Sequence, residues 1–124
     1  MSAIATFSLV ALDCPQPREL AEFYSAITGF PVVRDDGDWV ELGSDGGATI
    51  AFQLATDHVP PVWPSAKHPQ QAHIDFDVPD LAVGERQVLE LGARKAELQP
   101  GTTFTVFIDP AGHPFCLVLA HDAR

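Results

Sequence analysis

The sequence predicts an α+β fold of two tandem βαβββ modules, whose strands form a curved mixed sheet around a cleft. Each half of the chain shows a strand, a helix, a glycine turn and further strands in the same order. Gly29 and Gly92, which end the two predicted helices, are 63 residues apart. Gly47 and Gly112, which precede the final strand of each half, are 65 residues apart. An internal repeat constrains the whole architecture, so we expect both halves to adopt one unit.

The repeat divides a single domain of 124 residues into a first module at about 4–55, a linker at 56–71 and a second module at about 72–120. A hydrophobic content of 46% with 19% charged residues is typical of a globular protein. The net charge of −10 argues against nucleic acid as a partner. The sequence shows neither a signal peptide nor an apolar run of about 18 residues, so we expect a cytoplasmic protein without a membrane partner.

In the first module, residues 5–12 form an apolar run of strand length, and prolines follow it. Residues 18–28 have apolar side chains at helical spacing, and Gly29 fits the left-handed position that commonly ends a helix. The remaining strands of this module are predicted at residues 31–34, 39–42 and 49–54.

In the second module, residues 72–78 alternate between polar and apolar, which is typical of a strand. This alternation places His73, Asp75 and Asp77 on one face. Asp80 is a suitable N-cap for a helix that runs to residue 91 and ends at Gly92. The remaining strands are predicted at residues 94–98, 103–108 and 115–119.

The linker is rich in proline, which favours an extended and ordered segment rather than a flexible one. It also contains Trp63, a residue type that is unusual in a loop. The indole ring either closes one end of the core or lines a ligand site, and the sequence leaves both alternatives open.

His73 is the strongest candidate for chemistry, because a neutral imidazole binds divalent metals and Asp75 lies two residues along the same face. The alternative, which the spacing alone favours, is a histidine hydrogen-bonded to a carboxylate. Cys116 lies in an apolar strand, where a free cysteine usually behaves as a small buried hydrophobic residue. A nucleophilic role would need a lowered pKa and a nearby base.

Four segments resemble the vicinal oxygen chelate superfamily, which contains glyoxalases, bleomycin-resistance proteins and extradiol dioxygenases. They are L-A-E-F-Y-S-A-I-T-G-F at 20–30, H-I-D-F-D-V at 73–78, L-G-A at 91–93 and D-P-A-G-H-P-F-C-L-V at 109–118. The V-P-P-V-W-P loop at 59–64 is similar to that of small glyoxalase-like proteins of actinobacteria. The resemblance implies paired βαβββ modules around a cleft, a small-molecule ligand and assembly as a homodimer.

Metal-using members of the superfamily place one ligand on the first strand and one on the last strand of each module. His73 matches the first-strand position of the second module, whereas Cys116 stands at the last-strand position, where an acid is expected. The corresponding positions of the first module fall on Ser8 or Leu9 and on Ala51 or Gln53. We therefore expect no cofactor and an absent or degenerate metal centre; a divalent metal, if bound, would use His73, Gln53 and Cys116.

The resemblance thus implies a small-molecule-binding protein of the glyoxalase and bleomycin-resistance type. One alternative is a glyoxalase-type lyase or isomerase, with or without a metal, in which His73 is the best candidate for the catalytic residue. A structural or regulatory dimer is a third alternative, so the sequence leaves open whether the protein is an enzyme. The expected ligand-binding residues are Trp39, Phe52, Gln53, Trp63, His73, Asp75, Phe107 and Cys116.

Overall fold

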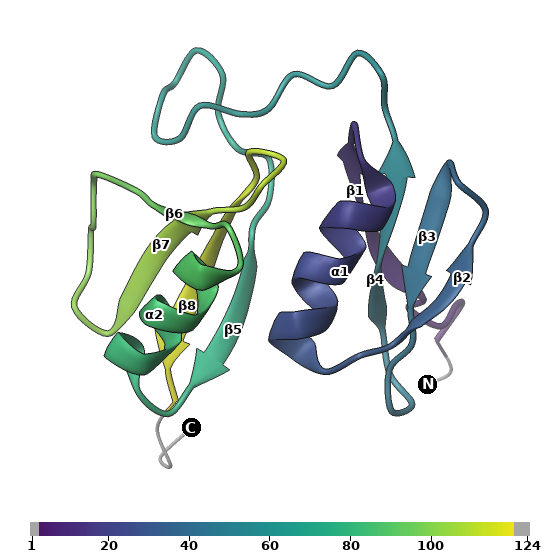
Figure 1. Ribbon diagram of the computed structural model, residues 1–124, viewed down its shortest axis with the longest axis horizontal. Helices are drawn as coiled ribbons and strands as arrows, with labels where there is room; N and C mark the ends of the chain where they lie inside the picture. The colour runs from purple at the N-terminus through teal and green to yellow at the C-terminus, as the bar shows by residue number, and fades with distance from the viewer. Residues whose placement is uncertain (1–2, 121–124) are drawn as a thin grey trace. The chain divides into compact units, whose positions relative to one another are not determined.

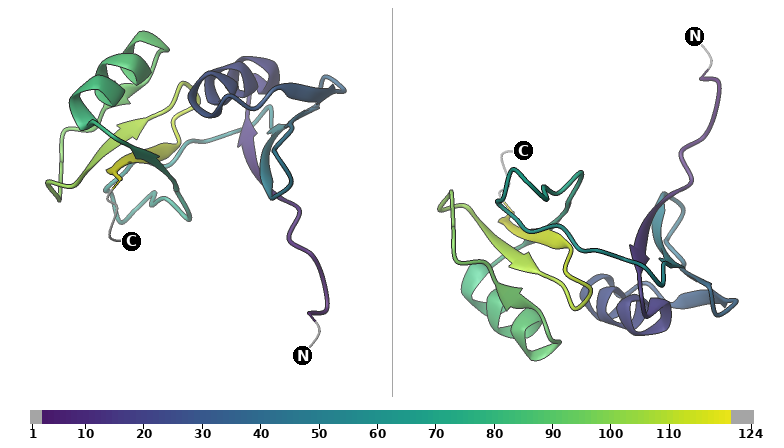
Figure 2. Two further views of the ribbon diagram at one scale, coloured as in Figure 1. Left: turned by 90° about the horizontal axis from the view of Figure 1, so that it is seen from below. Right: turned by 90° about the horizontal axis from the view of Figure 1, so that it is seen from above.

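The computed structural model describes residues 3–120, and the chain forms two compact units that meet in sequence between His58 and Val59. Each unit is one βαβββ module with an open, four-stranded mixed sheet, which confirms the predicted α+β fold. In each unit one helix lies along one face of its own sheet (Figures 1 and 2). Over residues 3–120, neither helix has the length and apolar character that crossing a membrane requires.

The first unit contains β1 (Leu9–Cys14), α1 (Pro17–Thr28), β2 (Val32–Asp35), β3 (Trp39–Leu42) and β4 (Thr49–Leu54). Its sheet has the order β1-β4-β3-β2, with β1 parallel to β4 and the other pairs antiparallel. Helix α1 buries Tyr24, whose ring stacks on Phe52 of β4 at a centroid distance of 5.7 Å. Gly29 ends α1 with a φ of 77°, as predicted.

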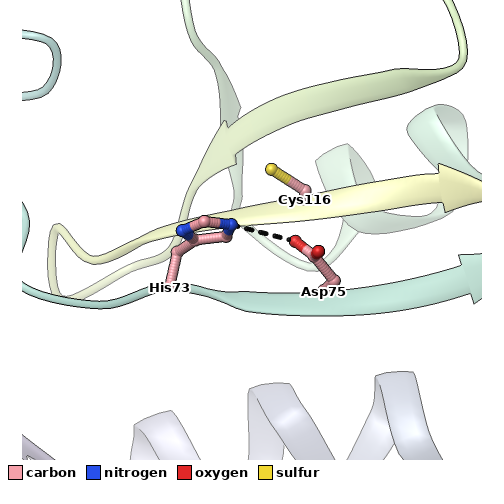
Figure 3. Close-up of side chains that lie close together, drawn as sticks. All are labelled: His73, Asp75 and Cys116. Atoms are coloured by element: carbon pink, nitrogen blue, oxygen red, sulfur yellow. Dashed lines mark ion pairs between the residues drawn. The ribbon is translucent and has the colours of Figure 1, made fainter.

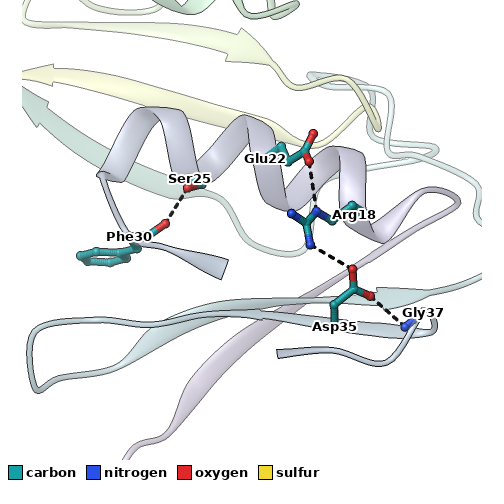
Figure 4. A network of polar contacts seen from close by, with 6 residues as sticks. All are labelled: Arg18, Glu22, Ser25, Phe30, Asp35 and Gly37. Carbon is teal, nitrogen blue, oxygen red and sulfur yellow. Dashed lines mark hydrogen bonds and ion pairs between the residues drawn. The ribbon is translucent and has the colours of Figure 1, made fainter. Parts of the chain in front are cut away.

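Polar contacts fasten α1 to the segment that follows it (Figure 4). The Arg18 guanidinium lies 3.1 Å from the Asp35 carboxylate on β2, and that carboxylate also accepts a hydrogen bond from the Gly37 N–H. The Gly37 N–H and the Arg18 guanidinium lower the pKa of Asp35. At the other end of the helix, the Ser25 hydroxyl donates to the carbonyl of Phe30. The ion pair is exposed, so its contribution to the free energy of unfolding is small.

The prediction of a strand at residues 5–12 was wrong at both ends. Strand β1 begins at Leu9 and continues to Cys14, because its parallel partner β4 offers backbone groups only from Thr49 onward. The ladder ends where Pro15 follows, since proline has no N–H to continue it. The apolar run therefore predicted that a strand exists here, but not which of its residues pair with β4.

The second unit contains β5 (Ile74–Val78), α2 (Leu81–Glu90), β6 (Arg94–Lys95), β7 (Phe104–Ile108) and β8 (Pro114–Leu119). Its sheet has the order β5-β8-β7-β6, again with the first and last strands parallel. The Asp80 carboxylate accepts hydrogen bonds from the N–H groups of Ala82 and Val83, which confirms it as the N-cap of α2. Strand β5 begins one residue after His73, so His73 precedes the ladder instead of belonging to it.

The predicted strand at 94–98 was correct at its start but wrong at its end, because β6 ends at Lys95. The side chain of Gln99 occupies the edge of β7 that a longer β6 would use. Its Nε2 donates to the carbonyls of Ala96 and Val106 at 2.8 and 2.9 Å, and its Oε1 accepts from the N–H of Val106 at 2.9 Å. A side-chain amide thus replaces a strand backbone at this position.

Replacing Gln99 by alanine should lower the free energy of unfolding by about 1–3 kcal/mol, because the N–H of the buried Val106 loses its acceptor. Urea denaturation measures the change. Gln87→Ala, at an exposed position of α2, is the matched control and should change this free energy by less than about 0.5 kcal/mol. An equally small change in both variants would contradict a role of Gln99 in holding the edge of β7.

Candidate functional site in the second module

One face of the second sheet is left uncovered by its helix. On β8, Leu117 faces α2, since a Cβ at Gly84 of that helix would lie 2.9 Å from the Leu117 Cδ1. Side chains alternate along a strand, so Cys116 points to the other face. The register pairs Cys116 with Asp75 of β5 and Val106 of β7, which places these three side chains in one row across that face.

A pocket of about 330 Å³ lies over this face, a volume at the small end of the range for ligand sites. The sheet contributes four mainly apolar side chains, Phe104, Val106, Pro114 and Val118. Trp63, Gln70 and Pro100 close the pocket from the connecting segments, and His73, Asp75 and Cys116 form its polar end. Trp63 therefore lines a pocket, as the ligand-lining alternative requires.

The loop that carries Trp63 packs closely against Gly112 through Pro60. A Cβ at Gly112 would lie 2.5 Å from the Cβ of Pro60, closer than two non-bonded carbon atoms can approach. Gly112 also has a φ of 95°, a conformation that residues with a side chain rarely adopt. The wall of the pocket thus depends on a residue without a side chain in the turn before β8.

Three side chains converge at the polar end of the pocket (Figure 3). The His73 Nε2 lies 3.2 Å from the Asp75 Oδ1, and one donor atom from each of His73, Asp75 and Cys116 lies within 4.8 Å of the others. The first two side chains are exposed, whereas Cys116 is buried at 7% exposure. The arrangement has a histidine oriented by a carboxylate and a thiol beside both.

The environment of Cys116 raises the pKa of its thiol to about 11. Burial is the main cause, because it disfavours the charged thiolate, and the negative charge of Asp75 adds to it. A hydrogen bond from the thiol to the Asp75 carboxylate stabilises the protonated form further. Without a bound cation the thiol stays neutral near pH 7, which is the opposite of what a nucleophilic cysteine requires.

The other predicted ligand-binding residues belong to the core of the second unit or to the first unit. Phe107 neighbours Val106 on β7 but points to the opposite face, where it is fully buried and stacks on Phe115. Phe52, in the first unit, is fully buried against Tyr24.

Trp39 and Gln53 are register partners on β3 and β4 of the first unit, where the Trp39 Nε1 donates to the Glu41 carboxylate at 3.2 Å. The second module therefore brings together only four of the predicted residues, Trp63, His73, Asp75 and Cys116.

Sequence reasoning missed most of the apolar wall of the pocket. Pro114 and Val118 could have been found, since they lie two residues on either side of Cys116 and therefore share its face. Phe104 and Val106 require the register of β7 against β8, which the sequence does not contain. Gln70 carries no signal at all, yet its Oε1 is buried without a hydrogen-bond partner among the described residues.

The superfamily's metal sites are built mainly from histidine and carboxylate ligands of both modules, and the residues present do not fit that set. In the first module Ser8 precedes β1, Ala51 has no donor side chain, and Gln53 offers only a neutral amide. In the second module the set of nitrogen, oxygen and sulfur donors is unlike the all-oxygen sites of hard cations. The donor types at these positions of the described chain therefore differ from the histidine and carboxylate set that the resemblance implies.

The model of a family described as glyoxalase-like domain matches residues 9–118, which is most of the chain. This match agrees with the resemblance to the vicinal oxygen chelate superfamily and confirms it. No curated protein sequence is a significant match to this chain.

Solved structures share the fold. A glyoxalase/bleomycin resistance protein/dioxygenase family enzyme from Burkholderia phytofirmans PsJN is 16% identical, with a TM-score of 0.70 over 91% of this chain and 97% of that one. A glyoxalase-related enzyme from Fulvimarina pelagi is 15% identical, with a TM-score of 0.68 over 94% of this chain and 89% of that one. At such identities the likeness shows the fold alone.

Asp75→Asn should lower the pKa of the Cys116 thiol, because it removes the charge that opposes the thiolate. In a Cys14→Ala background, where Cys116 is the only cysteine, alkylation by iodoacetamide should be slow at pH 7 and accelerate as the pH rises towards about 11. Asp75→Asn should move this acceleration to lower pH. Glu90→Gln, which removes an exposed charge on α2, should leave the profile in place, and a shift of equal size there would contradict the assignment.

Proposed function

The chain belongs to the glyoxalase-like domain family, and from this premise we propose that it binds a small organic molecule in the pocket of the second module. The observation that carries the proposal is the pocket itself, which has apolar and aromatic walls and a polar end. Such a pocket is the usual form of a small-molecule site. The proposal includes a cytoplasmic location, assembly as a homodimer and the absence of the superfamily's standard metal centre.

The walls of the pocket favour a ligand with a flat apolar body. Trp63 and Phe104 present aromatic rings, and burial of apolar area contributes about 25 cal/mol for each Å² removed from water. Aromatic contacts of good geometry add about 0.5–1.5 kcal/mol. The pocket is small, so the ligand should fill it with one or two rings rather than a long chain.

The connecting segment that closes the pocket favours a ligand with a hydrogen-bond donor. The buried Gln70 Oε1 has no partner among the described residues, and an unsatisfied buried acceptor costs about 1–3 kcal/mol. Rotation of the Gln70 side chain towards the pocket would let an N–H or O–H group of a ligand remove this cost. No Lys or Arg is among the described residues that line the pocket, so nothing there selects for an anion.

A glyoxalase-type lyase or isomerase is the second candidate, and the contact between His73 and Asp75 favours it. If the His73 Nε2–H donates to the carboxylate, Nδ1 is left as an acceptor that can take a proton from a small oxygenated substrate. A carboxylate that orients an imidazole in this way is common in general-base catalysis. This chemistry requires no metal, and conversion of 2-oxoaldehydes that is lost in His73→Ala would establish it.

Titration of a library of small aromatic alcohols and amines, with the protein kept in chelator, tests the binding proposal. In a Trp39→Phe background Trp63 is the only tryptophan, so its fluorescence should change as a ligand enters the pocket. Val118→Phe, which places a ring in the pocket, should weaken binding at least about tenfold, or 1.4 kcal/mol. The ligand should be recovered chemically unchanged.

Val83→Phe is the matched control, because Val83 is exposed on α2, which covers the opposite face of the sheet. Equal loss of affinity in Val83→Phe and Val118→Phe would show that the ligand binds outside this pocket, which would contradict the proposal. Gln70→Leu should weaken ligands that carry a donor and leave their donor-free analogues unaffected. Turnover of any bound ligand would favour the lyase or isomerase instead.

A further inference from the structure

We propose that His73, Asp75 and Cys116 form a zinc-type metal site contained wholly in the second module. The three side chains offer one nitrogen, one oxygen and one sulfur donor, all within 4.8 Å of one another. Donor atoms of a tetrahedral zinc site lie about 3.5 Å apart, since the bonds to zinc measure about 2.0–2.3 Å. Small rotamer adjustments of these side chains would therefore close the site around an ion.

The backbone already holds the donors in place. Asp75 and Cys116 are register partners on adjacent parallel strands, so the β5–β8 ladder fixes the distance between their Cβ atoms. His73 precedes Asp75 by two residues and turns its imidazole towards the same carboxylate (Figure 3). A site supported by a strand ladder is more precise than one built on loops alone.

The donor set selects the class of metal. Zinc is bound by cysteine sulfur, histidine nitrogen and carboxylate oxygen, and sites with three protein ligands keep a fourth position for water or a ligand. Here the fourth position would open into the pocket that the same three residues line. Magnesium and manganese prefer oxygen ligands and should bind poorly.

This site differs from the one that the resemblance implies. It includes Asp75, which that arrangement does not use, and takes no ligand from the first module. Binding would release the thiol proton of Cys116 to solvent and form a metal–sulfur bond. The site is also independent of the proposed function, because the organic ligand is tested in metal-free protein and the metal is tested without any ligand.

Cobalt(II) titrated into the reduced, metal-free chain provides the test, since cobalt replaces zinc and gives optical bands. A thiolate-to-cobalt charge-transfer band and intense visible bands should rise to one equivalent for each chain. Cys116→Ala should abolish the charge-transfer band, and His73→Ala and Asp75→Ala should each weaken binding more than tenfold. Cys14→Ala, which alters the buried cysteine of the first unit, is the matched control and should retain both bands.

Zinc should displace the cobalt, whereas excess magnesium or manganese should not. The inference is overturned if no charge-transfer band forms, if the band survives in Cys116→Ala, or if Cys14→Ala abolishes it. Far-UV circular dichroism checks that each variant is folded. X-ray absorption of the unaltered chain loaded with zinc needs no variant, and a zinc shell without a sulfur at about 2.3 Å would also overturn the site.

Discussion

The parallel pairing of the first and last strands is the constraint on which each module depends. Parallel neighbours cannot be joined by a tight turn, and in each module a helix and two further strands lie between them in sequence. In the second module this pairing sets Asp75 beside Cys116, residues that are 41 positions apart in the chain. The same pairing puts β8 next to both β5 and β7, so its outward side chains stand at the centre of the pocket floor. The parallel pairing of β5 with β8 therefore both builds the sheet and brings the site residues together.

The sequence predicted best what local chemistry decides. The end of α1 at Gly29 and the cap at Asp80 depend on residues within one helical turn, and both were correct. The alternation around Asp75 was also correct, because it repeats every two residues. Strand ends depend instead on distant partners, as β1 shows by following Thr49 of β4. Gln99 shows a second reason why a strand end was predicted wrongly. Its side-chain amide makes the hydrogen bonds at the edge of β7 that the backbone of a longer β6 would make.

For the candidate site, residue type predicted His73 and Asp75 together, whereas adjacency to Cys116 required the register. Phe107 shows that one position along a strand separates a pocket residue from a core residue. Its neighbour Val106 lines the pocket, whereas Phe107 lies in the core. An aromatic residue in a strand indicates burial but not which face it occupies. Asp75 connects the polar residues, because it contacts the imidazole and accepts a hydrogen bond from the thiol. Burial, together with the negative charge of Asp75, keeps the thiol of Cys116 protonated, and a bound cation would reverse that preference.

The close approach of Pro60 to Gly112 limits how the pocket can change during evolution of this fold. The Trp63 wall belongs to a loop whose sequence can change without breaking any ladder of the sheet, so ligand preference can drift while the fold persists. Gly112 limits that freedom from outside the pocket. A mutation there would lift the loop and remodel the cavity without altering any residue in it. Relatives that carry a side chain at this position should therefore enclose differently shaped cavities, even where their lining residues are the same.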